Sequence, residues 1–182
     1  MKQRIQDATV ICEGTQQILK KMMPEGIPPL KLFKALANNE RILDKLKNSN
    51  LLDHGVLSLK EREIIIDRTT AMAGAEYEWG VHIAFFAKKI DLTKPQIQSL
   101  AHGKSSDDCW TDNEKIIIEF CDELHHTSHI SDPTYKKMNE FWNEEQIIEA
   151  VTITGYYRMI SYLVNVIRPE HEEYAHSFND YL

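Results

Sequence analysis

Helix-capping sequences recur along this chain and mark the starts of several helices. In a capping box, a polar side chain at the cap and a carboxylate or amide three residues later satisfy backbone N–H groups that the first helical turn leaves without partners. No alternation of apolar and polar residues persists over five positions, so the fold is predicted to be all-α. The boxes lie at Ser58–Glu61, Thr93–Gln96 and Thr111–Glu114, with a looser form at Asn143–Gln146 and a cap followed by proline at Ser131–Pro133.

The apolar pattern divides the chain into three predicted parts. Residues 1–27 are expected to form a helical arm and a linker, residues 28–168 a helical domain, and residues 169–182 a charged, solvated tail. The last long helix is apolar nearly all round, so we expect it to lie centrally or in a subunit interface. The predicted helices span 3–23, 29–37, 40–52, 59–73, 76–88, 94–101, 112–127, 133–142 and 144–167, with a turn at 53–55.

Composition excludes several classes of partner. The chain has 182 residues and a net charge of −7, so it carries no electrostatic footprint for nucleic acid or an anionic membrane. The longest apolar region, Ala150–Ile167, contains Arg158 and Asn165, and no membrane span is expected. The first residues lack the apolar core of a signal peptide, and the three cysteines are too widely spaced for a disulfide framework or a zinc pattern. We therefore expect a reduced, cytoplasmic setting.

One stretch, Ala75–His82, combines a carboxylate and an imidazole at helical spacing. Glu78 and His82 are four residues apart and share a helix face. The tight turn at Gly74 predicts that this helix packs antiparallel to the preceding one, which would bring Glu63 towards His82. A buried trio of this kind can exchange protons near neutral pH. The alternative is a surface Glu–His pair beside an exposed Glu63, but the apolar neighbours favour burial.

The same residues carry a resemblance to a known family. The pattern Arg62-Glu63-Ile64 followed by Gly74-Ala75-Glu76-Tyr77-Glu78-Trp79-Gly80-Val81-His82 resembles the carboxymuconolactone decarboxylase and alkylhydroperoxidase D-like (AhpD-like) family. The resemblance extends over about residues 28–168 and includes weaker motifs at 123–125, 130–132 and 155–165. It implies an AhpD-like helical bundle whose site lies on an antiparallel helix pair. It also implies self-association as a dimer, trimer or hexamer.

The peroxidase branch of that family uses a Cys-x-x-Cys pair that this chain lacks. By spacing, the two cysteine positions correspond to Ala75 and Glu78, while the glutamate and histidine of the relay correspond to Glu63 and His82. Disulfide–dithiol chemistry needs an attacking and a resolving thiol, so peroxidase activity is not expected. Residual redox activity through Cys109 or Cys121 is a separate hypothesis.

The decarboxylase branch lacks the cysteine pair and implies a small acidic lactone or oxo-acid as substrate, with no cofactor and no metal. Glu78 and His82 would then act as base and acid, with Glu63 orienting His82. Because a cation usually holds a carboxylate substrate, Arg158 is the first candidate for binding and Arg62 the second, although Arg158 is also consistent with a structural ion pair. Trp79 and Tyr157 would line the pocket, unless such aromatic residues belong to the core. A ligand-binding or assembly protein without enzymatic activity is the alternative function.

Two histidine-containing clusters offer weaker interpretations. His125 and His129 have metal-type spacing if the helix continues that far, with Glu123 and His126 nearby, but the following residues are typical of a helix end. The segment 171–176 contains two histidines and two glutamates in the tail, where a solvated surface is the simpler expectation.

Overall fold

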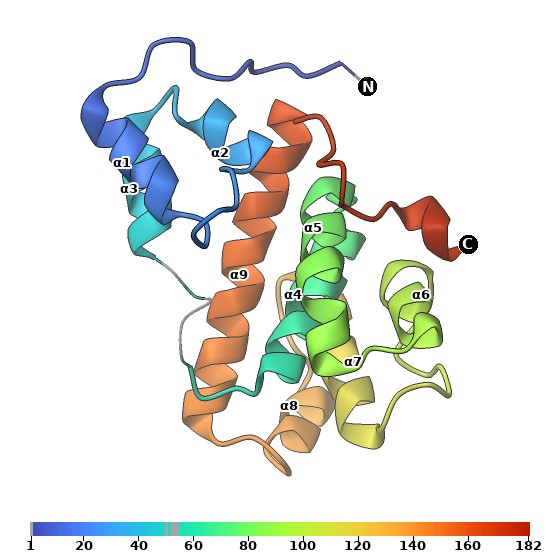
Figure 1. The fold of residues 1–182 in the computed structure, drawn as a ribbon. Helices are drawn as coiled ribbons and strands as arrows, with labels where there is room; N and C mark the ends of the chain where they lie inside the picture. Colours follow the sequence, from blue (N-terminus) through green and yellow to red (C-terminus); the bar gives the residue numbers. More distant parts are fainter. Residues whose placement is uncertain (1, 50, 52–54) are drawn as a thin grey trace.

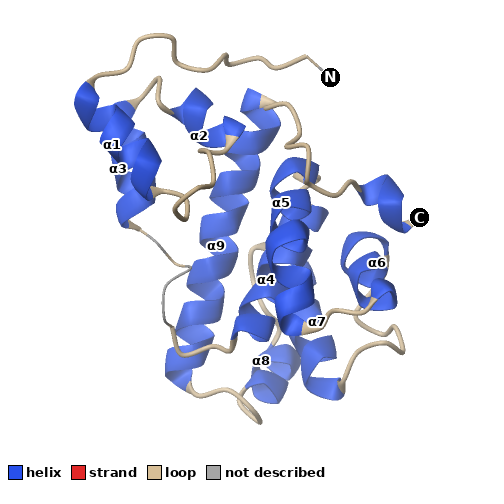
Figure 2. Ribbon diagram, in the orientation of Figure 1, coloured by secondary structure: helices blue, strands red, loops and turns tan. Residues whose placement is uncertain are grey.

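The computed structural model describes residues 2–49, 51 and 55–182. Helices joined by loops make up this described part, which contains no strand (Figures 1 and 2). The prediction of an all-α fold is confirmed. The helices are α1 (Glu13–Lys21), α2 (Lys31–Leu36), α3 (Glu40–Asn48), α4 (Leu59–Met72), α5 (Glu76–Phe86), α6 (Lys94–His102), α7 (Asp112–Thr127), α8 (Asp132–Met138) and α9 (Glu144–Ile167), with 3-10 turns η1 (Ala87–Ile90) and η2 (Phe178–Tyr181).

Helix α4 is the centre of the molecule and contacts α5, α6, α7 and α9. Its residues from Arg62 to Thr70 are all buried. Besides Glu63, five of them are charged or carry a hydroxyl group. Arg68 is neutralised by Asp122 of α7, whose two carboxylate oxygens accept from its guanidinium at 2.6 and 2.8 Å. The same guanidinium donates to the carbonyl oxygens of Ser99 and Leu100 in α6. One buried cation therefore joins three helices, because a buried charge is tolerated only when it is paired.

A tight connection turns α5 back onto α4. Gly74 has φ +64°, a left-handed conformation that glycine adopts without a steric penalty, and it follows directly after the C-cap of α4. At the other end of α4, Ser58 and Glu61 form the predicted capping box. The antiparallel pair is thus defined at its start and at its turn by local sequence.

The first predicted helix is too long. Residues 3–12 are not helical, and α1 begins only at Glu13, where the Cys12 thiol accepts from the backbone N–H of Thr15. The extended segment instead donates backbone hydrogen bonds to the rest of the chain, from Arg4 to the carbonyl of Ile167 at 2.9 Å and from Ala8 to that of Lys34 at 3.1 Å. These tertiary bonds replace the hydrogen bonds that a helix would have formed.

Two other helices end four residues earlier than predicted. Helix α3 ends at Asn48, and most of the turn predicted at 53–55 lies outside the described residues. Helix α8 ends at Met138, four residues short, and Trp142 beyond it donates from its indole N–H to Glu61 at 2.7 Å.

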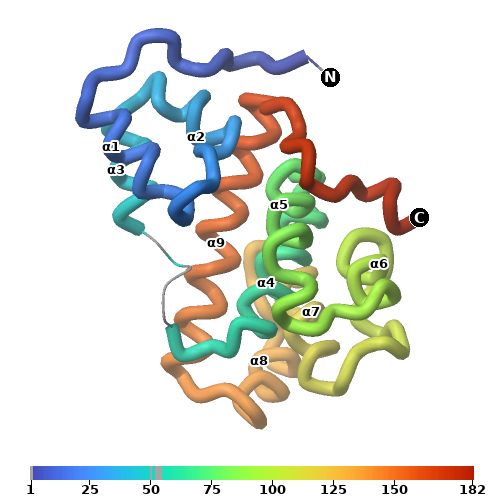
Figure 3. The backbone as a smooth tube through the Cα atoms, in the orientation of Figure 1, coloured from blue at the N-terminus to red at the C-terminus, as the bar shows by residue number. Residues whose placement is uncertain are grey.

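The C-terminal segment is bound to α5 and is not the solvated tail that its charge predicts. Figure 3 shows it running across the end of α5 to finish beside α6. Glu172 accepts from the Tyr77 hydroxyl at 2.6 Å, and the His176 backbone N–H donates to the carbonyl of Gly80. A Cβ atom at Gly80 would meet the His176 carbonyl oxygen at 2.0 Å, so glycine permits this close approach. These specific contacts hold the segment against α5, although its composition predicts a polar, solvated tail.

One face of α9 is exposed and apolar, while its opposite face packs on α4 and α5. Ile148 is 67% exposed and Tyr162 is 58% exposed. Among the described residues, no helix combines the length and apolar character needed to cross a bilayer.

Candidate active site

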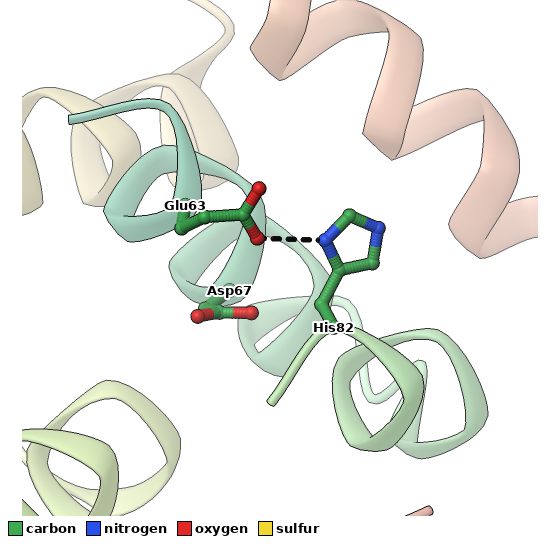
Figure 4. Close-up of side chains that lie close together, drawn as sticks. All are labelled: Glu63, Asp67 and His82. Atoms are coloured by element: carbon green, nitrogen blue, oxygen red, sulfur yellow. Dashed lines mark hydrogen bonds and ion pairs between the residues drawn. The ribbon is translucent and has the colours of Figure 1, made fainter. Parts of the chain in front are cut away.

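The predicted meeting of Glu63 and His82 is present at the centre of the α4–α5 pair. The Nδ1 atom of His82 lies 2.8 Å from Oε2 of Glu63, and the two groups point directly at each other (Figure 4). Glu63 is 0% exposed and His82 is 4% exposed. A hydrogen bond from Nδ1–H to this carboxylate orients the ring and presents Nε2 on its other side.

Glu78 lies on that other side of the imidazole. Its Oε1 is 3.6 Å from Nε2 of His82, one helical turn away on α5. Burial by itself lowers the pKa of His82, but the charge and hydrogen bond of Glu63, together with Glu78, outweigh it and raise the pKa well above its usual value. The ring is therefore held as an imidazolium between two carboxylates.

Asp67 is a site residue that the sequence analysis missed. It follows Glu63 by four residues on α4, is 1% exposed, and lies on the side of the helix that faces α5 (Figure 4). Burial raises the pKa of Asp67 well above its ordinary value, and the nearby charge of Glu63 adds to this. The signal that could have revealed it is a second carboxylate one turn after Glu63 in a helix otherwise expected to be buried.

Glu63, Asp67 and His82 also have the arrangement of a small donor set. One ligand atom from each lies within 4.8 Å of the others, and Oε1 of Glu63 and Oδ1 of Asp67 have no hydrogen-bond partner. Two carboxylates and one imidazole are ligands that several divalent ions accept. These residues could therefore hold either protons or a metal ion, and the experiment below separates the two.

A cavity of about 330 Å³ opens onto Glu78 and His82. Tyr157 of α9 also lines it, and its ring packs edge-on against the imidazole with 5.1 Å between centroids. The segment after α1, Met22–Pro24, forms part of the wall, so the N-terminal region contributes to the pocket. The remaining walls are mostly apolar or aromatic and include Leu30, Leu32, Phe33, Leu46, Val81, Phe85, Phe86, Tyr156 and Ile160.

Solved structures share this arrangement of helices. The structure matches the crystal structure of an alkylhydroperoxidase AhpD core, an uncharacterized peroxidase-related protein from Ralstonia eutropha JMP134, with a TM-score of 0.78 and 15% identity over 94% of this chain and 95% of that one. The fold is that of the AhpD core. An uncharacterized peroxidase-related protein from Silicibacter sp. TM1040 matches over 98% of both chains, with a TM-score of 0.77 and 17% identity.

The debrominase Bmp8 has a similar fold as well, with a TM-score of 0.72 and 11% identity over 88% of this chain and 87% of that one. No protein-family model and no curated protein matches this sequence. At these identities the likeness establishes the AhpD-like fold, and the chemistry has to be argued from this chain's own residues.

Two residues expected to bind substrate do not line the pocket of this AhpD-like fold. Arg158 donates to the Tyr162 hydroxyl at 3.1 Å and also contacts His125 of α7. Trp79 is fully buried and packs against Phe178 and Tyr181, on the side of α5 that the C-terminal segment covers. Of the predicted binding residues only Tyr157 lines the cavity; Arg62, the second candidate cation, is buried in α4 and is not part of the lining.

The weaker clusters do not assemble into a site. Helix α7 ends at Thr127 with Ser128 in the left-handed conformation, so His125 and His129 do not share a helix face. Glu123 accepts hydrogen bonds from the backbone and hydroxyl of Ser131 and so supports the start of α8. His171 and His176 belong to the segment that packs on α5.

The cysteines lie away from the cavity as well. None of Cys12, Cys109 and Cys121 is among its lining residues. Burial raises the pKa of the thiols of Cys109 and Cys121, which disfavours the reactive thiolate. This geometry does not favour redox chemistry at the candidate site.

Proposed function

We propose that this protein catalyses cofactor-free proton transfer at carbon, as an isomerisation or decarboxylation of a small organic acid or lactone. The observation that carries the proposal is the buried line of Glu63, His82 and Glu78, which ends at an apolar cavity large enough for a small molecule. Catalytic acids and bases are commonly placed where burial and neighbouring charges shift their pKa values, as they do here for His82.

Each member of the line has a distinct role in this mechanism. The Glu78 carboxylate removes a proton from the carbon beside a carbonyl group, and the His82 imidazolium gives its Nε2 proton to the carbonyl oxygen as the enol forms. Returning the proton to a different carbon completes an isomerisation. In a decarboxylation, no proton is removed first: the bond between the carboxylate and the carbon beside the carbonyl breaks, carbon dioxide leaves, and the electron pair of that bond forms the enolate, whose carbon is then protonated. Glu63 is a positioning residue that keeps His82 charged and oriented.

One neighbouring structure supports a small cyclic substrate, whereas this chain's own residues argue against a peroxidase reaction. A cysteine-to-alanine variant of the debrominase Bmp8 was solved in complex with 2,3,4-tribromopyrrole, so this fold can enclose a small ring. A peroxidase reaction is not proposed, because Ala75 and Glu78 occupy the positions where the resemblance places the two thiols.

Deuterium incorporation from solvent tests the proposed reaction. Lactones and oxo-acids incubated with the protein in D₂O should gain carbon-bound deuterium, or lose carbon dioxide, as followed by NMR. His82→Gln should slow this reaction by at least about 100-fold, the scale of a lost general acid. His126→Gln changes an exposed histidine outside the cavity and should leave the rate unchanged.

Repeating the assay with a chelator distinguishes the proton relay from a metal site. The rate should be insensitive to EDTA; loss of activity that a divalent ion restores would instead assign Glu63, Asp67 and His82 to a metal and overturn the cofactor-free mechanism. Ligand-induced melting shifts without any exchange or turnover would favour the non-enzymatic binding protein.

We also propose that the exposed face of α9 pairs with the same face of a second copy. Its residues follow alternating steps of four and three, the spacing of a helix–helix seam. An antiparallel pair centred on Gly155, which has no atom within 4 Å of its Cβ position, would place Ile148 of each copy against Tyr162 of the other in a self-complementary contact. The seam positions are Ile148, Thr152, Gly155, Met159, Tyr162 and Val166.

Sedimentation measures this association. The unmodified chain should sediment as an oligomer, and Ile148→Glu combined with Tyr162→Glu should produce a folded monomer, because the pairing would bury two unpaired charges in each copy. Gln98→Glu, at an exposed position on α6, is the control. A monomeric unmodified chain, or an oligomer that the double variant leaves intact, would contradict the pairing.

A further inference from the structure

The candidate pocket has an uneven distribution of charge. Besides two tyrosines, five of its lining residues are ionisable: Glu78, His82 and the three lysines Lys21, Lys47 and Lys89. The lysines come from three separate elements, the end of α1, the last turn of α3, and η1. In a chain whose net charge is −7, three cations around one cavity are a local reversal of the overall charge.

These lysines have few partners of their own. No ion pair within the described residues includes any of the three. The Lys89 ammonium lies over the ring of Phe86, 4.8 Å from its centroid, and that of Lys47 is 3.5 Å from the side-chain oxygen of Asn48. Their positive charge therefore remains available to a bound anion.

The two ends of the cavity differ in depth as well as in charge. Glu78 and His82 are buried, whereas Lys21 and Lys89 are exposed and Lys47 is half-buried. Apolar and aromatic side chains occupy the walls between them, such as Leu46 and Phe85. A molecule that fills this space meets acid–base groups at its inner end, apolar surface along its body and ammonium groups at its outer end.

We infer that the substrate is an apolar or aromatic small molecule that carries an anionic group at the end remote from its reacting carbon. The anion lies among Lys21, Lys47 and Lys89 at the mouth. The uncharged end, a ketone, enol or lactone carbonyl, reaches Glu78 and His82, because an anion there would face the carboxylate of Glu78. Of the two proposed reactions this arrangement fits the isomerisation, since a decarboxylation would place a carboxylate at the reacting carbon. The position of the reaction rests on the proposed function, whereas the recognition of the anion rests on the lysines and the walls. This lysine rim takes the role that Arg158 was expected to have.

The chain offers a matched control for each rim lysine. Lys20, Lys45 and Lys88 lie in the same three elements, are exposed and do not line the cavity. A rim variant, Lys21→Gln with Lys47→Gln and Lys89→Gln, and a control variant, Lys20→Gln with Lys45→Gln and Lys88→Gln, both lose three positive charges. Any difference between them reports the position of the charges, because the change in net charge is the same.

Two fluorescent probes with the same rings separate anion recognition from apolar binding. One is 1-anilinonaphthalene-8-sulfonate, and the other is its uncharged counterpart N-phenyl-1-naphthylamine. The rim variant should bind the sulfonate about tenfold more weakly than the control variant at low salt, and the difference should shrink as salt is added. Both variants should bind the uncharged probe within about twofold of the unmodified protein.

Three results would overturn the inference: equal sulfonate affinity in the two variants, an equal loss for the uncharged probe, or no sulfonate binding by the unmodified protein. The proposed function can fail independently. Rim-dependent binding without deuterium incorporation would refute the reaction and leave the anion site standing, and deuterium incorporation with rim-independent binding would do the reverse.

Discussion

Replacing Glu63 with glutamine should destabilise the protein by about 3 kcal/mol and lower the pKa of His82. Removing one partner of a buried ion pair costs about 3–5 kcal/mol, because the remaining charge is left uncompensated. The lower figure is expected here, since Glu63→Gln also removes the repulsion that adds to the effect of burial in raising the pKa of Asp67. Urea unfolding followed by circular dichroism measures the stability, and NMR titration of the imidazole measures the pKa.

The free energy of unfolding should decrease as pH rises. His82 binds its proton more tightly in the folded protein than in the unfolded chain, where its pKa is about 6.5. The protonated His82 therefore stabilises the folded state fully below about pH 6.5. This stabilisation is lost as pH rises through the pKa of His82 in the folded protein, so the free energy of unfolding should fall over that range. Asp67 acts in the same direction from its unfolded value of 3.8 upward. In the Glu63→Gln variant, the free energy of unfolding should depend less steeply on pH in both ranges.

A surface carboxylate is the control for this prediction. Glu119 is 3.2 Å from Lys137 in a solvent-exposed pair, so Glu119→Gln should change the stability by less than about 1 kcal/mol. An equally small effect of Glu63→Gln, with an unchanged titration of His82, would show that Glu63 does not hold the imidazolium.

Trp79→Ala should destabilise the protein by about 3–5 kcal/mol, the range for truncating a large aromatic side chain in a core. Trp79 has no exposed surface, and its ring lies 4.9 Å from that of Phe178 and 5.7 Å from that of Tyr181. Its loss should also release the C-terminal segment, so the amide of His176 should exchange with solvent much faster. Hydrogen exchange read residue by residue measures this release.

Tyr135→Ala is the matched aromatic control. This side chain is 44% exposed on α8, and its truncation should change the stability by no more than about 0.5 kcal/mol. If Trp79→Ala left the stability and the C-terminal segment unchanged but abolished probe binding, Trp79 would be the substrate contact predicted from the sequence.

The meeting of Glu63, Glu78 and His82 was predictable because two of them are one helical turn apart and one tight turn brings the third back to them. Glu78 and His82 share a face by helical periodicity, and the glycine turn brings Glu63 back to them. Which side chains line the cavity was not predictable in this way. Arg158 and Trp79 lie on α9 and α5, two helices that do line the cavity. Whether a given residue of these helices faces the cavity depends on how the helices pack. The rim lysines come from elements that are distant in the sequence, and no local pattern relates them.

Caps and turns depend on groups within a few residues of one another, so the sequence alone was sufficient to predict the all-α fold and the starts of α4, α6, α7 and α9. It also placed a carboxylate and an imidazole one turn apart. Contacts between distant parts of the chain keep residues 3–12 extended, pack the charged C-terminal segment on α5 and bury Asp67 beside Glu63, and no local pattern predicts these features. The physical reason is that burial, and the pKa shifts it causes, depend on which surfaces meet across the whole chain.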